Sequence, residues 1–192
     1  MDLHALISSF SYLAIFLLMV TNGAVNFPSS QLLYIICGYF VSAGSLLFVP
    51  TVLVGALGNT IGNIVTFLLI KKYQHPLARK LLMMDEATFS SVHGALHDTF
   101  SRRGMWWIFL GKLTPSVKAF IPVVAGLADT STKLTSFIFL IASLLWAVGV
   151  TSLGYYFGEH ITLTSFTAVS LIIGLTITYV VYRSIQKRLP RK

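Results

Sequence analysis

Acidic residues are scarce in this chain. The 192 residues include only 6 Asp and Glu against 14 Lys and Arg, which gives a formal net charge of +8. Charged residues make up 10% of the chain, compared with about 25% in ordinary soluble domains. Hydrophobic residues reach 55%, and the mean hydropathy is +0.79. This composition excludes an ordinary soluble domain and predicts a single integral membrane domain.

Cysteine is almost absent. The single cysteine, Cys37, excludes an internal disulfide and a Cys-based metal cluster. His93 and His97 are spaced like metal ligands beside Asp98, but no third ligand is arranged around them, so a solvated helix face is expected. Neither a Walker-type phosphate loop nor a nucleophile elbow occurs. The sequence therefore predicts no metal, no cofactor and no enzymatic activity.

Four apolar segments are long enough to cross a bilayer, which takes roughly 20 residues per helix. They cover residues 3–21, 51–70, 134–157 and 163–182. A fifth segment is short, is interrupted by Gly38 and Gly44, and ends at Pro50. We interpret it as a re-entrant hairpin over residues 31–50.

The segment 105–127 combines an apolar background with two lysines and two prolines, Lys112, Lys118, Pro115 and Pro122. A lysine at the bilayer centre costs ~2.5 to 3.5 kcal/mol, so such residues normally face a cavity or a partner. Proline removes a backbone donor and breaks a helix. The pattern predicts a second re-entrant hairpin over residues 105–127 that presents two ammonium groups to an anion. The alternative is that both lysines extend to the membrane interface from a shallow hairpin.

The basic residues predict the orientation, because lysine and arginine concentrate on the cytoplasmic side. They flank the polar stretch 74–103, which we interpret as a cytoplasmic amphipathic helix on the bilayer surface, and they form a basic tail at 183–192. The turns 22–30 and 158–162 contain no lysine or arginine and are expected outside. The predicted fold is an all-α integral membrane domain with about four transmembrane helices, both termini in the cytoplasm, and two re-entrant hairpins entering from opposite sides.

Several motifs resemble one family. Gly111-Lys112-Leu113-x-Pro115-x-Val117-Lys118, followed by Pro122-x-x-Ala125-Gly126, resembles the G-R-F-x-P-x-x-R and P-x-x-A-G signature of the DedA family, also called SNARE-associated or VTT-domain proteins. Gly58-Asn59-x-x-Gly62-Asn63, Ser30-Gln31, and Trp146 with Gly154-Tyr155-x-x-Gly158 resemble further family segments in the same order. The resemblance covers residues 21–158.

The resemblance implies a set of substrate-binding residues, namely Lys112, Lys118, Pro115, Thr114, Gln31, Asn22 and Asn63. Lysines stand where the family has arginines, and the amides of Asn22, Gln31 and Asn63 stand where it has acids. Without those carboxylates, a proton-driven cycle is not expected, whereas phosphate recognition by ammonium groups is. The alternative for Asn22 and Gln31 is an ordinary turn outside the bilayer. For Asn59 and Asn63 it is hydrogen bonding between helices.

The resemblance implies a transporter, scramblase or flippase in the inner (plasma) membrane for a phosphate-bearing lipid, such as undecaprenyl phosphate or a phospholipid. The expected partners are this anionic lipid and the membrane, with no nucleic acid; a homo-oligomer stays open. One alternative is a membrane enzyme that acts on lipid phosphates. Another is a membrane-homeostasis factor that transports nothing.

Overall fold

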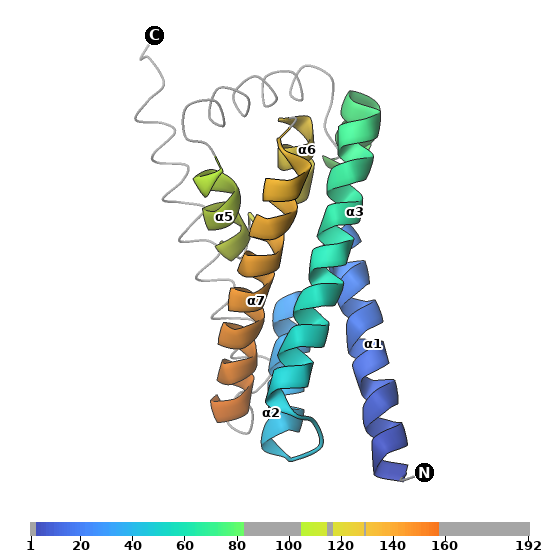
Figure 1. The fold of residues 1–192 in the computed structure, drawn as a ribbon, viewed down its shortest axis with the longest axis vertical. Helices are drawn as coiled ribbons and strands as arrows, with labels where there is room; N and C mark the ends of the chain where they lie inside the picture. The colour runs from blue at the N-terminus through green and yellow to red at the C-terminus, as the bar shows by residue number, and fades with distance from the viewer. Residues whose placement is uncertain (1–2, 83–104, 115–116, 129, 158–192) are drawn as a thin grey trace.

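The described part of the chain is entirely helical. The computed structural model describes residues 3–82, 105–114, 117–128 and 130–157, and within them it has no strand. Its helices are α1 (Leu3–Val25), α2 (Ser30–Ser42), α3 (Phe48–Leu82), α5 (Trp106–Leu113), α6 (Ile121–Leu127) and α7 (Thr132–Phe157) (Figure 1). The prediction of an all-α fold is confirmed.

Helix α3 is the longest element and spans the height of the molecule (Figure 1). Its 35 residues correspond to about 52 Å at 1.5 Å per residue. Two stretches are long and apolar enough to cross a membrane, Phe48–Tyr73 and Thr132–Phe157, and they match the predicted crossings 51–70 and 134–157. Helix α3 continues past Lys71 and Lys72 to Leu82, so the predicted interfacial segment 74–103 begins within it. The rest of that segment, the predicted crossing 163–182 and the tail 183–192 lie outside the described residues.

Helices α1 and α2 form a hairpin whose turn lies at mid-height of the molecule. Helix α1 rises beside α3, and α2 descends again beside α7 (Figure 1). The turn between them, residues 26–29, has Asn26 in the left-handed region at φ 58° and a cis peptide bond between Phe27 and Pro28. Here the predicted topology is wrong in two respects. The turn 22–30 is not at an outer end, and α1 begins at the end of the molecule opposite Lys71 and Lys72 (Figure 1).

The structure also differs from the predicted re-entrant hairpin over residues 31–50. Its turn, residues 43–47, lies at the lower end of the molecule rather than inside it (Figure 1). The polarity of Asn22 suggested a position in water, but the side chain is only 3% exposed and is hydrogen-bonded within the bundle. Polar turns can lie inside a membrane domain when protein groups satisfy them. The amino-terminal hairpin is therefore α1–α2, and residues 43–47 connect it to α3.

The second predicted hairpin, 105–127, is a helix–turn–helix unit. Helix α5 descends from the upper end, ends at Leu113, and is followed after a turn by the ascending α6 (Figure 1). Pro122 lies in the first turn of α6, where the missing N–H costs no intrahelical bond. The predicted break in the helix is thus observed between Leu113 and Ile121.

The core contains three apolar clusters, and a polar layer separates the lower one from the other two. The lower cluster includes Tyr34, Val52, Ala56, Ala147 and Val150. One of the other two joins α3 to α5, α6 and α7 through Phe67, Ile108, Ile121, Ala125 and Phe139. Between them lie Asn59 and Asn63 on α3 and Ser143 on α7. The candidate site occupies this layer.

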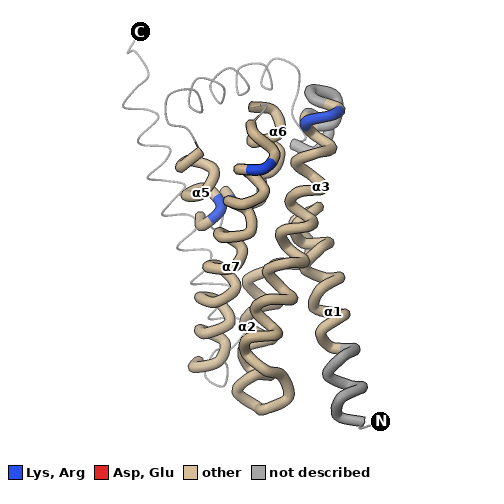
Figure 2. The backbone as a smooth tube through the Cα atoms, viewed as in Figure 1, with Lys and Arg blue, Asp and Glu red and all other residues tan. Residues whose placement is uncertain are grey.

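Charge is distributed unequally along the molecule. Figure 2 shows the described lysines in the upper half and none in the lower half. All six acidic residues of the chain lie outside the described residues, so none is present in this part of the structure. The upper end, with Lys71, Lys72 and Lys133, is the one that the positive-inside rule would place in the cytoplasm.

Candidate functional site

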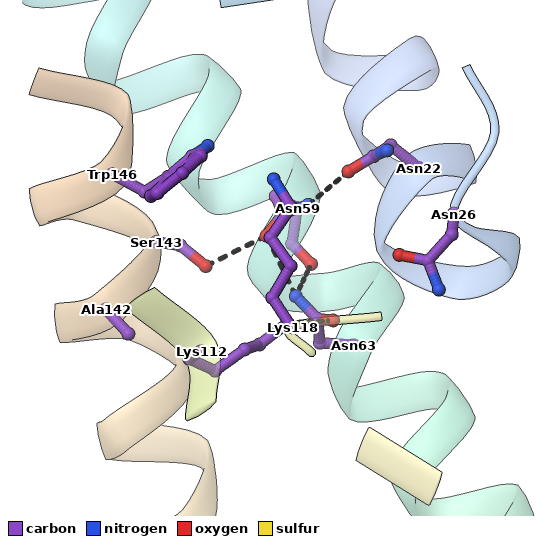
Figure 3. A pocket seen from close by; sticks show the side chains of 9 residues that line it. All are labelled: Asn22, Asn26, Asn59, Asn63, Lys112, Lys118, Ala142, Ser143 and Trp146. Atoms are coloured by element: carbon purple, nitrogen blue, oxygen red, sulfur yellow. Dashed lines mark hydrogen bonds between the residues drawn. The ribbon is translucent and has the colours of Figure 1, made fainter. Parts of the chain in front are cut away.

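A small cavity lies in the polar layer, where the α1–α2 hairpin meets the α5–α6 hairpin. Its lining comes from α1 and the following turn, α3, α5 and the turn after it, and α7: Asn22, Asn26, Asn59, Asn63, Lys112, Lys118, Ala142, Ser143 and Trp146 (Figure 3). The cavity leaves about 10 Å³ for the centre of a water molecule, which is close to the minimum that one water needs. In this conformation the space inside the site is narrow, although the cavity is partly open at the exposed residue Asn26.

A continuous chain of hydrogen bonds links the elements around the cavity (Figure 3). Lys112 Nζ donates to Asn63 Oδ1 at 2.6 Å, and Asn63 Nδ2 donates to Asn59 Oδ1 at 2.8 Å. Asn59 Nδ2 donates to Asn22 Oδ1 at 2.8 Å, and Asn22 Nδ2 donates to the carbonyl of Pro28 at 2.5 Å. Ser143 Oγ also donates to Asn59 Oδ1, at 3.0 Å. Asn59 is therefore the residue through which α1, α3 and α7 are connected.

The two lysines are held by neutral groups. Lys112 is 6% exposed, and its Nζ atom lies 5.2 Å from the ring centroid of Phe139. Lys118 Nζ donates to Ser30 Oγ at 2.5 Å and lies 4.3 Å from the ring centroid of Trp146. An ammonium group has three donors and no acceptor. Within the described part of the chain each lysine donates one hydrogen bond, to a neutral acceptor, so both cations keep donors for a further partner.

The tips of the two hairpins are in direct contact. Asn26 Nδ2 donates to the carbonyl of Ala119 at 3.0 Å, and Lys118 reaches Ser30 from the opposite side of the same contact. Thr66 Oγ1 on α3 donates to the carbonyl of Ala24 at 2.8 Å and fixes the first tip. These contacts hold the two tips together beside the cavity.

The structure brings together four of the seven predicted site residues. Asn22, Asn63, Lys112 and Lys118 line the cavity. Gln31 is half-buried and Thr114 donates to the carbonyl of Leu110 at 2.9 Å, and neither lines the cavity. Pro115 lies outside the described residues. The Asn22 side chain is buried in the bundle, and whether this turn lies outside the bilayer stays a prediction.

Several cavity residues were not predicted as site residues. Asn59, one turn before Asn63, was considered only as a link between helices, and it has that role as well as lining the cavity. Asn26, Ser143 and Trp146 were not singled out as ligands. Ser143 and Trp146 are three residues apart on α7 and so lie on one face of the helix. That spacing could have indicated that the two side chains face the same site.

A separate apolar groove lies between α5 and α7, above the cavity. It encloses about 320 Å³ and is lined by Met105, Trp106, Phe109, Phe137, Ile138 and Ile141. Phe109 is three residues before Lys112 on α5, and Ile138 precedes Phe139, which contacts the same lysine. The groove is therefore adjacent in the fold to the cationic cavity.

Comparison with known proteins shows the family. The family model of the VTT domain matches residues 27–156, more than half of the chain. No solved structure matches.

Three relatives illustrate the similarity. The membrane protein ML0287 of Mycobacterium leprae is 36% identical over 33% of this chain and 28% of its own length. The inner membrane protein YqjA of Escherichia coli is 23% identical over 74% of this chain and 65% of its own length. The membrane protein YkoX of Bacillus subtilis is 25% identical over 79% of this chain and 66% of its own length. The chain thus spans less than two thirds of each relative, and each is named as a membrane protein.

Proposed function

Because this chain belongs to the VTT-domain family, also known as the DedA family, we propose that it is a multi-pass membrane protein that moves a phosphate-bearing lipid across the bilayer. Candidate substrates are a polyprenyl phosphate, such as undecaprenyl phosphate, and a phospholipid. The headgroup binds in the cavity between the hairpin tips, and the hydrocarbon tail stays in the apolar phase. The single observation on which this rests is the pair of cavity-lining lysines, whose hydrogen-bond partners among the described residues are neutral.

The electrostatics of the cavity favour an anion. A buried cation without a counter-charge is costly, and lysine inside a membrane domain faces a partner or a cavity. Among the described residues there is no carboxylate that could neutralise Lys112 or Lys118. Amide and hydroxyl oxygens hold both side chains in place without removing their charge. A phosphate provides the negative charge and the acceptor oxygens that the site lacks.

The apolar groove between α5 and α7 suits the tail of the same lipid. Its lining is aliphatic and aromatic, and it lies close to Lys112. A headgroup at Lys112 with a chain along Phe109 and Ile141 would keep the hydrocarbon out of the polar layer. The narrow cavity has room for about one water, so we further propose that the hairpin tips separate when the headgroup enters.

The alternative of an enzyme that acts on lipid phosphates has less support. Ser143 is a hydroxyl that lines the cavity, and it donates to Asn59 Oδ1. Activation of such a nucleophile requires an adjacent base, and none of the described residues that line this cavity is a histidine or a carboxylate. In a factor that transports nothing, two lysines in the polar layer would destabilise the fold and have no function.

A flipping assay tests the proposal. The protein is reconstituted in phosphatidylcholine vesicles with a fluorescent polyprenyl phosphate, and a membrane-impermeant quencher reports which leaflet holds the probe. We expect wild type and Lys133→Met to equilibrate the probe, because Lys133 is an exposed residue at the start of α7. Lys112→Met and Lys118→Met should slow equilibration at least about tenfold, since a charge-assisted contact contributes ~1.5 kcal/mol or more. Equal rates for all four proteins would exclude the cavity as the headgroup site.

A further inference from the structure

Trp146 has a buried donor with no acceptor. The indole Nε1 atom is shielded from solvent and finds no hydrogen-bond partner among the residues that the structure describes. Buried polar atoms are nearly always hydrogen-bonded, so such an exception needs an explanation. Trp146 also lines the cavity beside the two lysines, and in Figure 3 its nitrogen lies at the end of the ring away from α7.

The side chains at this position supply donors in excess. The indole N–H can only donate, as can an ammonium group. The amide oxygens of three asparagines in the layer already accept hydrogen bonds: Asn63 Oδ1 accepts from Lys112, Asn59 Oδ1 accepts from Asn63 and Ser143, and Asn22 Oδ1 accepts from Asn59. What is missing around Trp146 is therefore an acceptor, not another donor.

We propose that the indole N–H of Trp146 is a third ligand of the lipid phosphate and donates to an oxygen that Lys118 also binds. The ring lies directly against Lys118 Nζ, at 4.3 Å from its centroid to the nitrogen, so one group bound at Lys118 is within reach of the ring edge. In this structure the ring face holds the ammonium group by a cation–π contact. When phosphate arrives, the ring edge supplies a directional hydrogen bond. This inference rests on the proposed function and adds a residue and an atom to it.

The Trp146→Phe substitution separates the two uses of the side chain. Phenylalanine keeps an aromatic face for Lys118 and removes the N–H. Binding of polyprenyl phosphate should weaken about tenfold, which is the lower range for loss of a hydrogen bond to a charged group. Trp107→Phe is the matched control, because Trp107 on α5 lines neither the cavity nor the apolar groove that we assign to the tail. It should bind as wild type does.

A spectroscopic test does not depend on whether Trp146→Phe folds. The chain has three tryptophans, so the double variant Trp106→Phe and Trp107→Phe leaves Trp146 as the only indole signal. The protein is labelled with ¹⁵N at the indole nitrogen and placed in phosphatidylcholine nanodiscs. Polyprenyl phosphate is then titrated in, with the corresponding uncharged polyprenol as the control. We expect the Trp146 N–H proton to move downfield and saturate with the phosphate only, as a new hydrogen bond to an anion requires.

The outcomes distinguish this inference from the function on which it rests. If the phosphate binds and Lys118→Met weakens that binding while the Trp146 signal stays fixed, the indole is not a ligand and the lysine site stands. If the uncharged polyprenol shifts the signal equally, the indole responds to the tail, and the inference is wrong. If the protein binds no polyprenyl phosphate, the proposed headgroup site and this inference both fail.

Discussion

Lys112 Nζ lies 2.6 Å from Asn63 Oδ1, so an amide, rather than a carboxylate, holds the most buried described lysine of the site. An aspartate at this position would make an ion pair and leave little net charge. The amide fixes the direction of the lysine and leaves its positive charge available. The same arrangement recurs at Lys118, which donates a hydrogen bond to the hydroxyl of Ser30.

Removal of the charge at Lys112 should separate folding from transport. A buried cation without a counter-ion destabilises the protein, so Lys112→Met should unfold at the same temperature as wild type or a higher one, while lipid transport is lost. Lys112→Arg should keep part of the transport, because the charge persists although its geometry differs. The measurements are thermal unfolding in detergent and the flipping assay. A large fall in the unfolding temperature of Lys112→Met would mean that the lysine is mainly structural.

Asn59 should be the most sensitive position of the polar layer. Asn59→Ala removes the partner of Asn22, Asn63 and Ser143 at once. We expect a loss of about 1 to 3 kcal/mol in the free energy of unfolding, because buried polar groups are left without partners. The control is Asn26→Gly, since Asn26 is exposed, its side chain donates to the carbonyl of Ala119, and glycine tolerates the positive φ at this position. Equal stability of the two variants would contradict the central role of Asn59.

The contact between α1 and α3 should tolerate no added methyl group. A Cβ atom at Gly62 would overlap the carbonyl oxygen of Val20, and one at Gly23 would overlap that of Asn59. Small residues let membrane helices approach this closely. Gly62→Ala should therefore lower the unfolding temperature markedly. Gly149→Ala, where nothing lies within 4 Å of the new atom, should raise stability by about 0.5 to 1 kcal/mol through helix propensity.

Linking the two hairpin tips should stop transport reversibly. Asn26→Cys and Ala119→Cys, in a Cys37→Ser background, place thiols on either side of the contact between the tips. A short, cleavable thiol cross-linker should block lipid flipping, and reduction should restore it, because the narrow cavity could not widen between the linked tips to admit a headgroup. Each single-cysteine protein treated in the same way is the control. Full transport with the tips linked would show that the headgroup takes another route.

The orientation can be read from accessible cysteines. Ser45→Cys lies in the exposed turn at the lower end, and Ser131→Cys lies before α7 at the lysine-bearing end. In cells, an impermeant maleimide should label the first from outside and leave the second unlabelled, in accordance with the positive-inside rule. The reverse pattern would invert the orientation. Labelling of both would contradict the placement of the two residues at opposite ends of the molecule.

Helix content, two long crossings and the break between Lys112 and Pro122 could be predicted from the sequence. Hydropathy over 20 residues and the helix-breaking chemistry of proline are local signals, so they do not depend on the rest of the fold. The lysine pair was found for a similar reason, because a charge in an apolar segment is conspicuous.

The amino-terminal topology could not be predicted in this way. A polar turn such as 22–30 has the same composition whether water or protein satisfies it. Only the pairing of Asn22 with Asn59, and of Asn26 with Ala119, decides between the two. Ser143 and Trp146 were missed because a single serine or tryptophan on an apolar helix is common, and its value depends on what faces it.

The glycine contacts between α1 and α3 also divide the molecule into a fixed part and a moving part. Backbone lies against backbone at Gly23, Gly58 and Gly62, so α1 cannot slide along α3 without overlap. Helix α6 also lies close to the backbone of α3, because a Cβ atom at Gly126 would meet the carbonyl oxygen of Phe67. Helix α5 is instead seated through side chains, such as Ile108 and Ile121, that can change rotamer. A transport cycle built on this fold would move α5 against a rigid unit of α1, α3 and α6. An antibody fragment that clamps α1 to α3 should then be harmless, whereas one that fastens α5 to α7 should be an inhibitor.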